Sequence, residues 1–235
     1  MKTTKLVILS TILCFSFLFA QDYSHGNPAQ QDWKLSVMGG LNRANLNTDQ
    51  GQAFPVFGPY NESKGRMILG ASLEKPISPV FSIQGGLFYV RDGAKSVTQA
   101  GTDETGNYLG DFYFMQDLRY LQVPISVKFN YTTPNLNSFV LIGPNFGILM
   151  SAKEKMNNEY DSPFEYDQDI ADQLNTFNLG LDMGLGSTYQ LSERFGIGFM
   201  LKYTLGLTNQ IKDSISNTSQ KTRDLQILIG PSYSF

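Results

Sequence analysis

The residues that could carry out a reaction are few in this 235-residue chain. The only histidine is His25 and the only cysteine is Cys14, and both precede the first regularly patterned segment. A serine nucleophile needs a base within hydrogen-bonding reach, and His25 lies too early in the chain to reach a site at the far rim of the expected fold. Carboxylates would then have to act as the general base, and no pair of them is recognisable. We therefore expect no catalytic residue and no cofactor.

Carboxylates are dense in two stretches, 92–118 and 151–175. Asp167, Asp169 and Asp172 offer the oxygen ligands that hard cations prefer. Their stretch lacks the glycine turn and final glutamate of a calcium loop, so we prefer a solvated acidic surface and predict no metal site. Long loops with aromatic residues often dock a partner or fold over a rim. The aromatic candidates for such contacts are Tyr108, Phe112, Tyr113, Tyr160, Phe164 and Tyr166.

The start of the chain has the layout of a cleavable export signal. Lys2 and Lys5 precede an apolar run that ends before Gln21. Cleavage there would remove Cys14, so the mature chain would form no disulfide and hold no metal through thiolates. The expected divisions are an export signal, a short periplasmic segment and one barrel domain, at 1–20, 21–32 and 33–235.

Acidic residues exceed basic ones. The whole chain has 21 acidic and 18 basic residues, and the expected cleavage removes two of the lysines. This balance excludes a basic surface for nucleic acid.

Strict alternation of apolar residues with polar residues or glycine recurs eight times and predicts eight β-strands. The clearest segment places Leu121, Val123, Ile125, Val127 and Phe129 on one face. Helical periodicity is nearly absent. The expected strands lie at 33–41, 67–75, 81–91, 120–129, 139–150, 176–189, 195–207 and 225–235.

The connections between these segments alternate in length. Long ones lie at 42–66, 92–119, 151–175 and 208–224, and short ones at 76–80, 130–138 and 190–194. Odd and even connections of an up-and-down barrel lie at opposite rims, so all the long loops share one rim. The pattern predicts an all-β, eight-stranded antiparallel up-and-down transmembrane β-barrel in the outer membrane, surrounded by lipid, with short turns facing the periplasm.

Alternation alone does not tell which face points inward, because a soluble lipocalin-like barrel would bury the apolar face. Aromatic residues mark the periplasmic ends of the apolar faces, as the girdles of membrane barrels do. Small glycines dominate the polar face and suit a crowded eight-stranded interior. Both observations favour the membrane barrel. The expected girdle consists of Trp33, Phe81, Phe129, Phe139, Tyr189, Phe195 and Phe235.

The polar face also carries charges of both signs. An ion-selective pore could use them, but an eight-stranded interior is just filled by side chains, so a buried hydrogen-bonded network is the preferred interpretation. The expected network contains Lys34, Glu74, Lys128, Asp182 and Lys202.

Two features disturb the pattern. Pro124, Pro144 and Pro231 fall within expected strands, and proline cannot donate a hydrogen bond to a strand ladder. In segment 139–150 apolar residues occupy both faces, so its facing stays open.

The run from Tyr120 to Phe129, YLQVPISVKF, resembles the YLxxPxxxKF/Y strand of the PorT-like outer-membrane β-barrels of Bacteroidota. Gly143-Pro144 and the terminal Tyr-Ser-Phe are similar to that family too. The resemblance covers about residues 33–235. It implies that the last strand is read by the barrel-assembly machinery. It also implies a link with protein secretion, the role of the family's namesake.

The function expected from the sequence is a non-enzymatic scaffold or accessory subunit whose external loops engage another envelope or secretion-system protein. The alternatives are a narrow channel for ions or small solutes and a secreted lipid-binding barrel.

Overall fold

The computed structural model describes residues 33–49, 62–63, 65–95, 99–102, 105–106, 108–158, 166–212 and 219–235. The expected export signal, the segment 21–32, and the loop residues Tyr160 and Phe164 lie outside the described residues. The strands are β1 Lys34–Asp49, β2 Glu62–Ser63, β3 Gly65–Pro76, β4 Phe81–Lys95, β5 Gln99–Thr102, β6 Tyr108–Thr132, β7 Leu136–Asn158, β8 Tyr166–Asp169, β9 Phe177–Gln190, β10 Phe195–Gly206 and β11 Ser219–Ser234, and a short 3-10 helix, η2, covers Ala171–Gln173.

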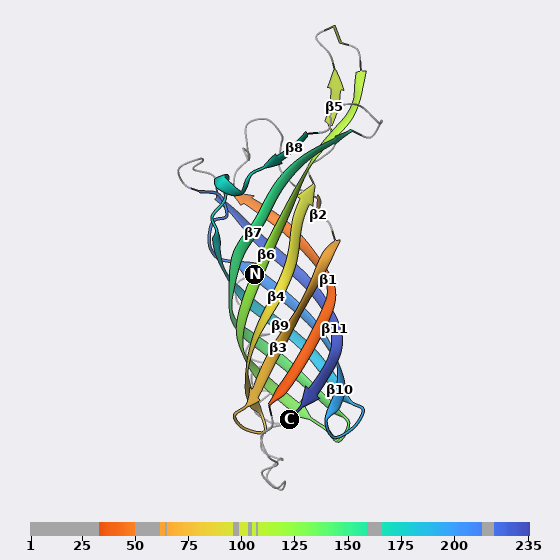
Figure 1. The fold of residues 1–235 in the computed structure, drawn as a ribbon, viewed down its shortest axis with the longest axis vertical. Coiled ribbons are helices and arrows are strands. Elements are labelled where there is room, and N and C mark those ends of the chain that lie inside the picture. The colour runs from red at the N-terminus through yellow and green to blue at the C-terminus, as the bar shows by residue number, and fades with distance from the viewer. Residues whose placement is uncertain are drawn as a thin grey trace, which may run out of the picture.

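Eight of these strands close a barrel (Figure 1). The pairing order is β4, β3, β1, β11, β10, β9, β7 and β6, and β6 pairs with β4 to complete the ring. All of these neighbours are antiparallel, and they follow one another along the chain except for β1 and β11, the first and last strands, whose pairing closes the ring. The eight-stranded up-and-down barrel predicted from the alternation is confirmed.

The strands are steeply tilted, as the register shows. Paired residues lead from Val90 through Ile68, Gly40 and Leu228 around the barrel to Asn130. The amide of Asn130 then bonds to the carbonyl of Val80, ten residues below Val90 (90 − 80) on the same strand. An offset of ten residues over eight strands corresponds to a tilt of about 40°, which is typical of closed barrels.

Strands β6 and β7 are much longer than expected. They rise beyond the rim as a ribbon that β5 and β8 widen by pairing with their outer halves (Figure 1). The prediction of loops at 92–119 and 151–175 is therefore wrong in part, since Tyr108, Phe112 and Tyr113 lie on β6 and Tyr166 lies on β8. Outside the membrane a strand needs no lipid-facing apolar side, so this part of the sequence shows no alternation.

The three prolines interrupt pairing without shifting it. Paired residues are absent beside Pro124 and Pro144, yet the same register resumes on both sides. The pairing of β1 with β11 likewise skips the partner position of Pro231 and resumes unchanged. The one register shift between β6 and β7 lies between Arg119 and Tyr120, at the outer end of the barrel.

Two lumen-facing glycines allow the strands to approach closely. A Cβ atom on Gly40 would overlap the backbone carbonyl of Ile227, and one on Gly230 would overlap that of Val37. Both overlaps are with backbone of the neighbouring strand, which cannot move aside as a flexible side chain can. Glycine at these positions therefore permits the tight curvature of a small barrel.

Chain segments beyond the strands cover the outer mouth. Ile170 and Leu174, next to η2, and Ile211, after β10, pack against Leu118 and Tyr120 of the barrel wall. Leu174 and Ile211 form a backbone bridge, and the Nε2 atom of Gln210 donates to the Tyr120 hydroxyl at 3.1 Å. An apolar cluster that belongs to the same chain thus packs at the outer mouth.

Candidate functional site

The outside of the barrel is apolar and the inside is polar. Outward positions alternate with buried lumen positions along every barrel strand, as in β10, where Phe195, Ile197 and Phe199 are exposed and Met200 and Lys202 are buried. An exposed apolar surface that encircles the molecule is far larger than soluble monomers carry. A secreted calyx for an apolar ligand would need the reverse arrangement, so this alternative is not supported.

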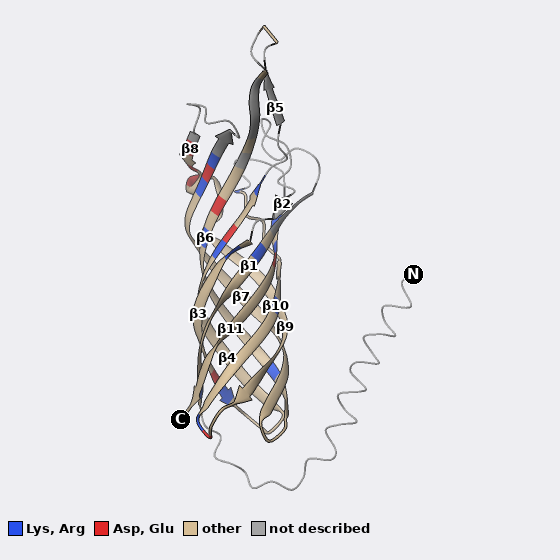
Figure 2. Ribbon diagram, turned by 90° about the vertical axis from the view of Figure 1, so that its right-hand side faces the viewer, with Lys and Arg blue, Asp and Glu red and all other residues tan. Residues whose placement is uncertain are grey.

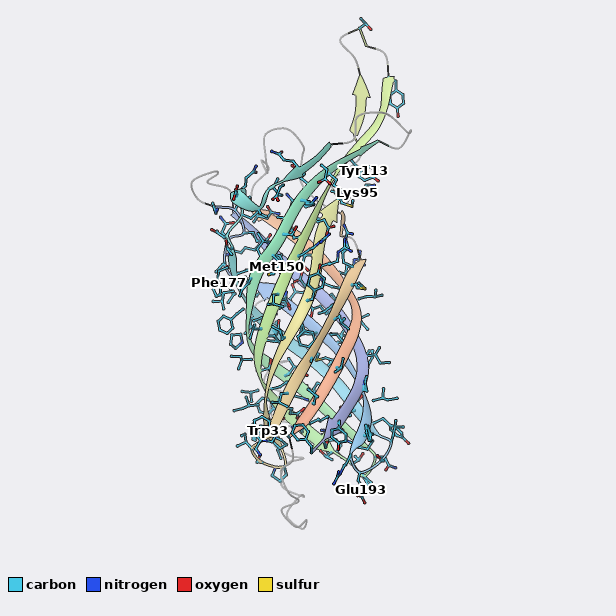
Figure 3. All side chains as sticks on the ribbon, viewed as in Figure 1. Trp33, Lys95, Tyr113, Met150, Phe177 and Glu193 are labelled. Atoms are coloured by element: carbon cyan, nitrogen blue, oxygen red, sulfur yellow. The ribbon has the colours of Figure 1, made fainter. Side chains whose placement is uncertain are left out.

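The aromatic girdle lies at the rim with the short turns, and Figure 3 shows Trp33 there. Six of its predicted members, Trp33, Phe81, Phe129, Tyr189, Phe195 and Phe235, are at least 40% exposed on the outer wall. Phe139 differs from the expectation, because it is 8% exposed and belongs to the core of the lumen. In this strand Val140 and Ile142 face outward instead, which settles the facing that the sequence left open.

The lower part of the lumen, near the short turns, holds a charged network. Lys128 Nζ lies 2.6 Å from Glu74 Oε2, and Ser82 Oγ donates to Glu74 Oε1 at 2.6 Å. Lys128 also lies 3.7 Å from the ring centroid of Phe139, and Lys34 Nζ donates to Thr188 Oγ1 at 3.0 Å. Lys128 and Glu74 thus form a buried ion pair, and the ammonium group of Lys34 is hydrogen-bonded to a threonine, so each charged group has a partner within the protein.

A second network lies higher in the lumen, around Asp182. Its carboxylate accepts hydrogen bonds from Lys202 Nζ at 2.8 Å, Thr204 Oγ1 at 2.6 Å and Asn145 Nδ2 at 3.0 Å. The Nδ2 atom of Asn145 also donates to Gln122 Oε1 at 3.1 Å. A single buried aspartate thus joins three strands, β7, β9 and β10.

Two further carboxylates, Asp92 and Asp224, lie in the lumen but were not predicted from the sequence, and each is 1% exposed. Asp92 accepts a hydrogen bond from Asn42 Nδ2, and Asp224 interacts electrostatically with Asp92, Asp182 and Lys202. Both stand just outside the strands predicted from the alternation. Every second residue of a barrel strand faces the lumen. Extending this spacing by one step beyond the predicted ends of the strands, as from Val90 to Asp92, would have identified both residues.

The lumen is filled between and above these networks. An apolar layer crosses its middle, made of Met38, Ile68, Phe88, Val90, Phe139, Leu141, Met200 and Leu228. Two internal cavities measure about 20 and 10 Å³, and the smaller one is lined by Asp224, whose Oδ1 has no hydrogen-bond partner in the described residues. A space of that size holds about one water molecule. Packed side chains therefore fill the described lumen at these levels.

The acidic candidates outside the barrel are engaged by the protein itself. Asp167 lies 3.5 Å from Lys153 and 3.3 Å from Lys155, and Asp169 Oδ1 accepts the amide of Ala171 at 2.9 Å. Desolvation raises the pKa of Asp167, but the hydrogen bonds and positive charges of the two lysines together lower it by more. The pKa of this carboxyl group therefore lies below its usual range. Asp172 is exposed at η2. Across the described ranges, no group of three or more His, Cys, Asp or Glu residues could hold a metal ion.

The expected docking aromatics are described only in part. Tyr113 lies beneath the ammonium group of Lys95, 4.1 Å from it, and Figure 3 shows the two residues together where the ribbon leaves the barrel. Tyr108 is 57% exposed near the end of the ribbon. The outer part of the ribbon therefore presents at least one exposed aromatic side chain.

None of the helical segments in the described residues has the length or apolar character that crossing a membrane requires.

The model of one protein family, described as "Outer membrane protein beta-barrel domain", matches residues 19–212. None of the curated proteins is similar to this chain in sequence. Solved structures with a similar course of the chain include Ail of Yersinia pestis, crystallised with the heparin analogue sucrose octasulfate, at 13% identity and a TM-score of 0.43, covering 87% of this chain and 99% of that one. Outer Membrane Protein W of E. coli has 11% identity and a TM-score of 0.46, over 89% and 100% of the two chains. OprG of Pseudomonas aeruginosa has 12% identity and a TM-score of 0.46, over 88% and 97%.

Proposed function

Because this chain belongs to the outer membrane protein beta-barrel domain family, we propose that it acts as a non-enzymatic accessory subunit of an envelope assembly. Its barrel is a membrane anchor, and its outer ribbon is the working surface. The observation that carries the proposal is the contrast between a filled lumen and a long ribbon that projects beyond the rim (Figure 1).

The ribbon is built as a platform. Residues 112–119 of β6 pair with 151–158 of β7 from the outer edge of the apolar wall upward, and β5 and β8 extend the sheet on either side. The edges of such a sheet offer unpaired backbone groups to a further strand. A partner protein with an extended segment is the ligand that this surface suits.

The class of assembly is taken from the PorT-like resemblance of YLQVPISVKF, which favours a protein-secretion assembly. In the structure this run covers the lower half of β6, with Gln122, Ser126 and Lys128 in the lumen. The resemblance thus concerns the barrel wall, and the secretion role rests on it alone.

A narrow channel is the second candidate, and the structure argues against it. Conduction would require both the middle apolar layer and the outer layer around Leu174 and Ile211 to move aside. We propose no enzymatic activity either, since the hydroxyl groups of Ser82 and Thr204, which donate to the lumen carboxylates Glu74 and Asp182, lie in a filled interior with no open cavity for a substrate beside them.

The test is purification of the tagged protein at its native level from its own host in mild detergent. We expect a stoichiometric envelope protein to accompany it, and we expect that protein to be lost when β5 and the outer ends of β6 and β7 are shortened. A matched control shortens the periplasmic turn at 191–194. Recovery of the barrel alone, or a partner that survives the ribbon deletion, would contradict the proposal.

A further inference from the structure

Five of the six arginines in the sequence lie on consecutive barrel strands, and Arg194 in a periplasmic turn is the sixth. The register places all five at one height. A line of constant height around the barrel does not follow directly paired residues. At each strand that it crosses, it moves along the strand by about 1.25 residues relative to the paired position, because the offset of ten residues is spread over eight strands. By this geometry the five lie within about 5 Å of the same height. They are Arg223 on β11, Arg43 on β1, Arg66 on β3, Arg91 on β4 and Arg119 on β6.

Four of these arginines face outward, since each stands between two lumen-facing residues that are at most 2% exposed. The flanking residues are Asn42 and Ala44, Val90 and Asp92, Leu118 and Tyr120, and Thr222 and Asp224. The fifth, Arg66, donates to the sulfur of Met115 at 3.5 Å. Arg43, Arg91, Arg119 and Arg223 are called the arginine arc.

The arginine arc lies at the outer edge of the apolar wall. On β4, Phe81 of the girdle and Arg91 are ten residues apart, and both face outward. At about 3.3 Å per residue and a tilt of about 40°, this is a height of about 25 Å, the usual height of the apolar band of a membrane barrel. Figure 2 shows the largely uncharged wall below this level and the charged residues above it.

Two arginines of the arc face each other, and one of them, Arg119, has no neutralising partner among the described residues. Arg91 and Arg119 are directly opposite each other on β4 and β6, an arrangement that destabilises a sheet. Asp117 lies 2.7 Å from Arg91, whereas Arg119 has no ion pair or hydrogen bond with a described residue. Arg43 and Arg223 form a second pair, diagonal across β1 and β11. An anion from outside the chain would relieve the repulsion between Arg91 and Arg119.

The arc is confined to one side of the barrel. At the same height the other three barrel strands present exposed apolar residues. These are Ile148 on β7, Phe177 on β9 and Leu207, which directly follows β10. Figure 3 shows Phe177 and Met150 together on that side. Side chains that only fix the depth of a barrel form belts around it. A one-sided group of arginines fits a ligand bound at one place.

We propose that the arginine arc binds the phosphate groups of a phosphorylated lipid in the outer leaflet. Guanidinium groups match phosphate oxygens in bidentate hydrogen bonds, and they do so most strongly where water is scarce. The nearest members of the two pairs are Arg91 on β4 and Arg43 on β1. They are two strand spacings apart, about 10 Å, which suits a headgroup with two phosphates. The acyl chains of the same lipid then lie against the apolar wall below, beside Leu41 and Met67.

The test uses the full mature chain folded in detergent, with bisphosphorylated lipid A as the probe and retention of the lipid measured by native mass spectrometry. We expect the wild type to retain this lipid at least ten times better than the same lipid without its phosphates. We expect inorganic pyrophosphate to compete only weakly, since it lacks the acyl chains. High salt should reduce retention.

The variant R43Q/R119Q/R223Q should lose retention about tenfold or more, while Arg91 is kept because Asp117 depends on it. The matched control K75Q/R194Q/K212Q removes the same number of charges away from the arc and should bind as the wild type does. A lysine variant, R43K/R119K/R223K, keeps the charge and should retain an intermediate amount. Slower gel migration after boiling shows that each variant is folded. Equal retention by the glutamine variant, or equal binding of the dephosphorylated lipid, would overturn the proposal.

Discussion

The ammonium nitrogen of Lys202 lies 2.8 Å from Oδ2 of Asp182, inside the barrel, where the two side chains are 3% and 0% exposed. The same carboxylate is also held by Thr204 and Asn145. Lys202 in addition lies 5.5 Å from the ring centroid of Phe88, in the middle apolar layer. The pair therefore joins the upper polar network to the apolar layer that fills the lumen.

Removal of one partner of this pair should destabilise the barrel strongly. Asp182→Ala leaves the Lys202 ammonium buried and unpaired, and we expect a loss of about 3–5 kcal/mol in the free energy of unfolding. The double variant Asp182→Leu with Lys202→Met should recover most of that loss, because neither member of the pair is left charged without the other. Guanidinium unfolding in detergent micelles measures both. A single variant as stable as the wild type would show that the pair is not buried in this way.

The filled lumen predicts an electrically silent barrel. In planar lipid bilayers we expect no stepwise conductance from the wild type, because two apolar clusters occupy the middle and the outer mouth of the lumen. Lys128→Ala and Asp182→Ala should be equally silent if folded, since neither side chain belongs to those clusters. A stable conductance that changes with either substitution would favour the channel instead.

Gly40 should tolerate no side chain. Gly40→Ala brings a methyl group into the backbone carbonyl of Ile227, and we expect a loss of about 1–3 kcal/mol or failure of the barrel to close. The neighbouring Gly39→Ala is the matched control, because its methyl group would meet Leu69 Cδ1 at 3.4 Å, an ordinary contact. We expect that control to change stability by no more than about 0.5 kcal/mol. Heat-modified gel migration and unfolding curves distinguish the two; similar behaviour of both variants would contradict the close approach.

Trp33 is the only tryptophan and reports the depth of the barrel. It is 41% exposed on the outer wall, with Lys75 Nζ 5.1 Å from its ring. We expect its fluorescence to be quenched more by lipids labelled near the headgroup than by lipids labelled at the acyl-chain end, because girdle aromatics lie at headgroup level. Stronger quenching from the bilayer centre would place the girdle at the wrong depth.

The sequence by itself determined the barrel wall. Alternation such as that of Leu121, Val123 and Ile125 is a local property with a period of two, and a membrane imposes it on every spanning strand. Strand number, the rim with long connections and most of the girdle follow from that local pattern. The charges of Lys128 and Asp182 could be placed in the lumen for the same reason, although their partners could not be named.

Only the tertiary structure decided which residues share a height and which segments continue beyond the membrane. The inward turn of Phe139 depends on the packing of the lumen and on its contact with Lys128. The ribbon of β6 and β7 and the buried Asp92 lie where the membrane no longer imposes alternation. The arginine arc arises from the offset between strands, because residues as far apart as Arg43 and Arg223 meet only when the last strand pairs with the first. Such pairing is non-local and leaves no pattern within any one segment.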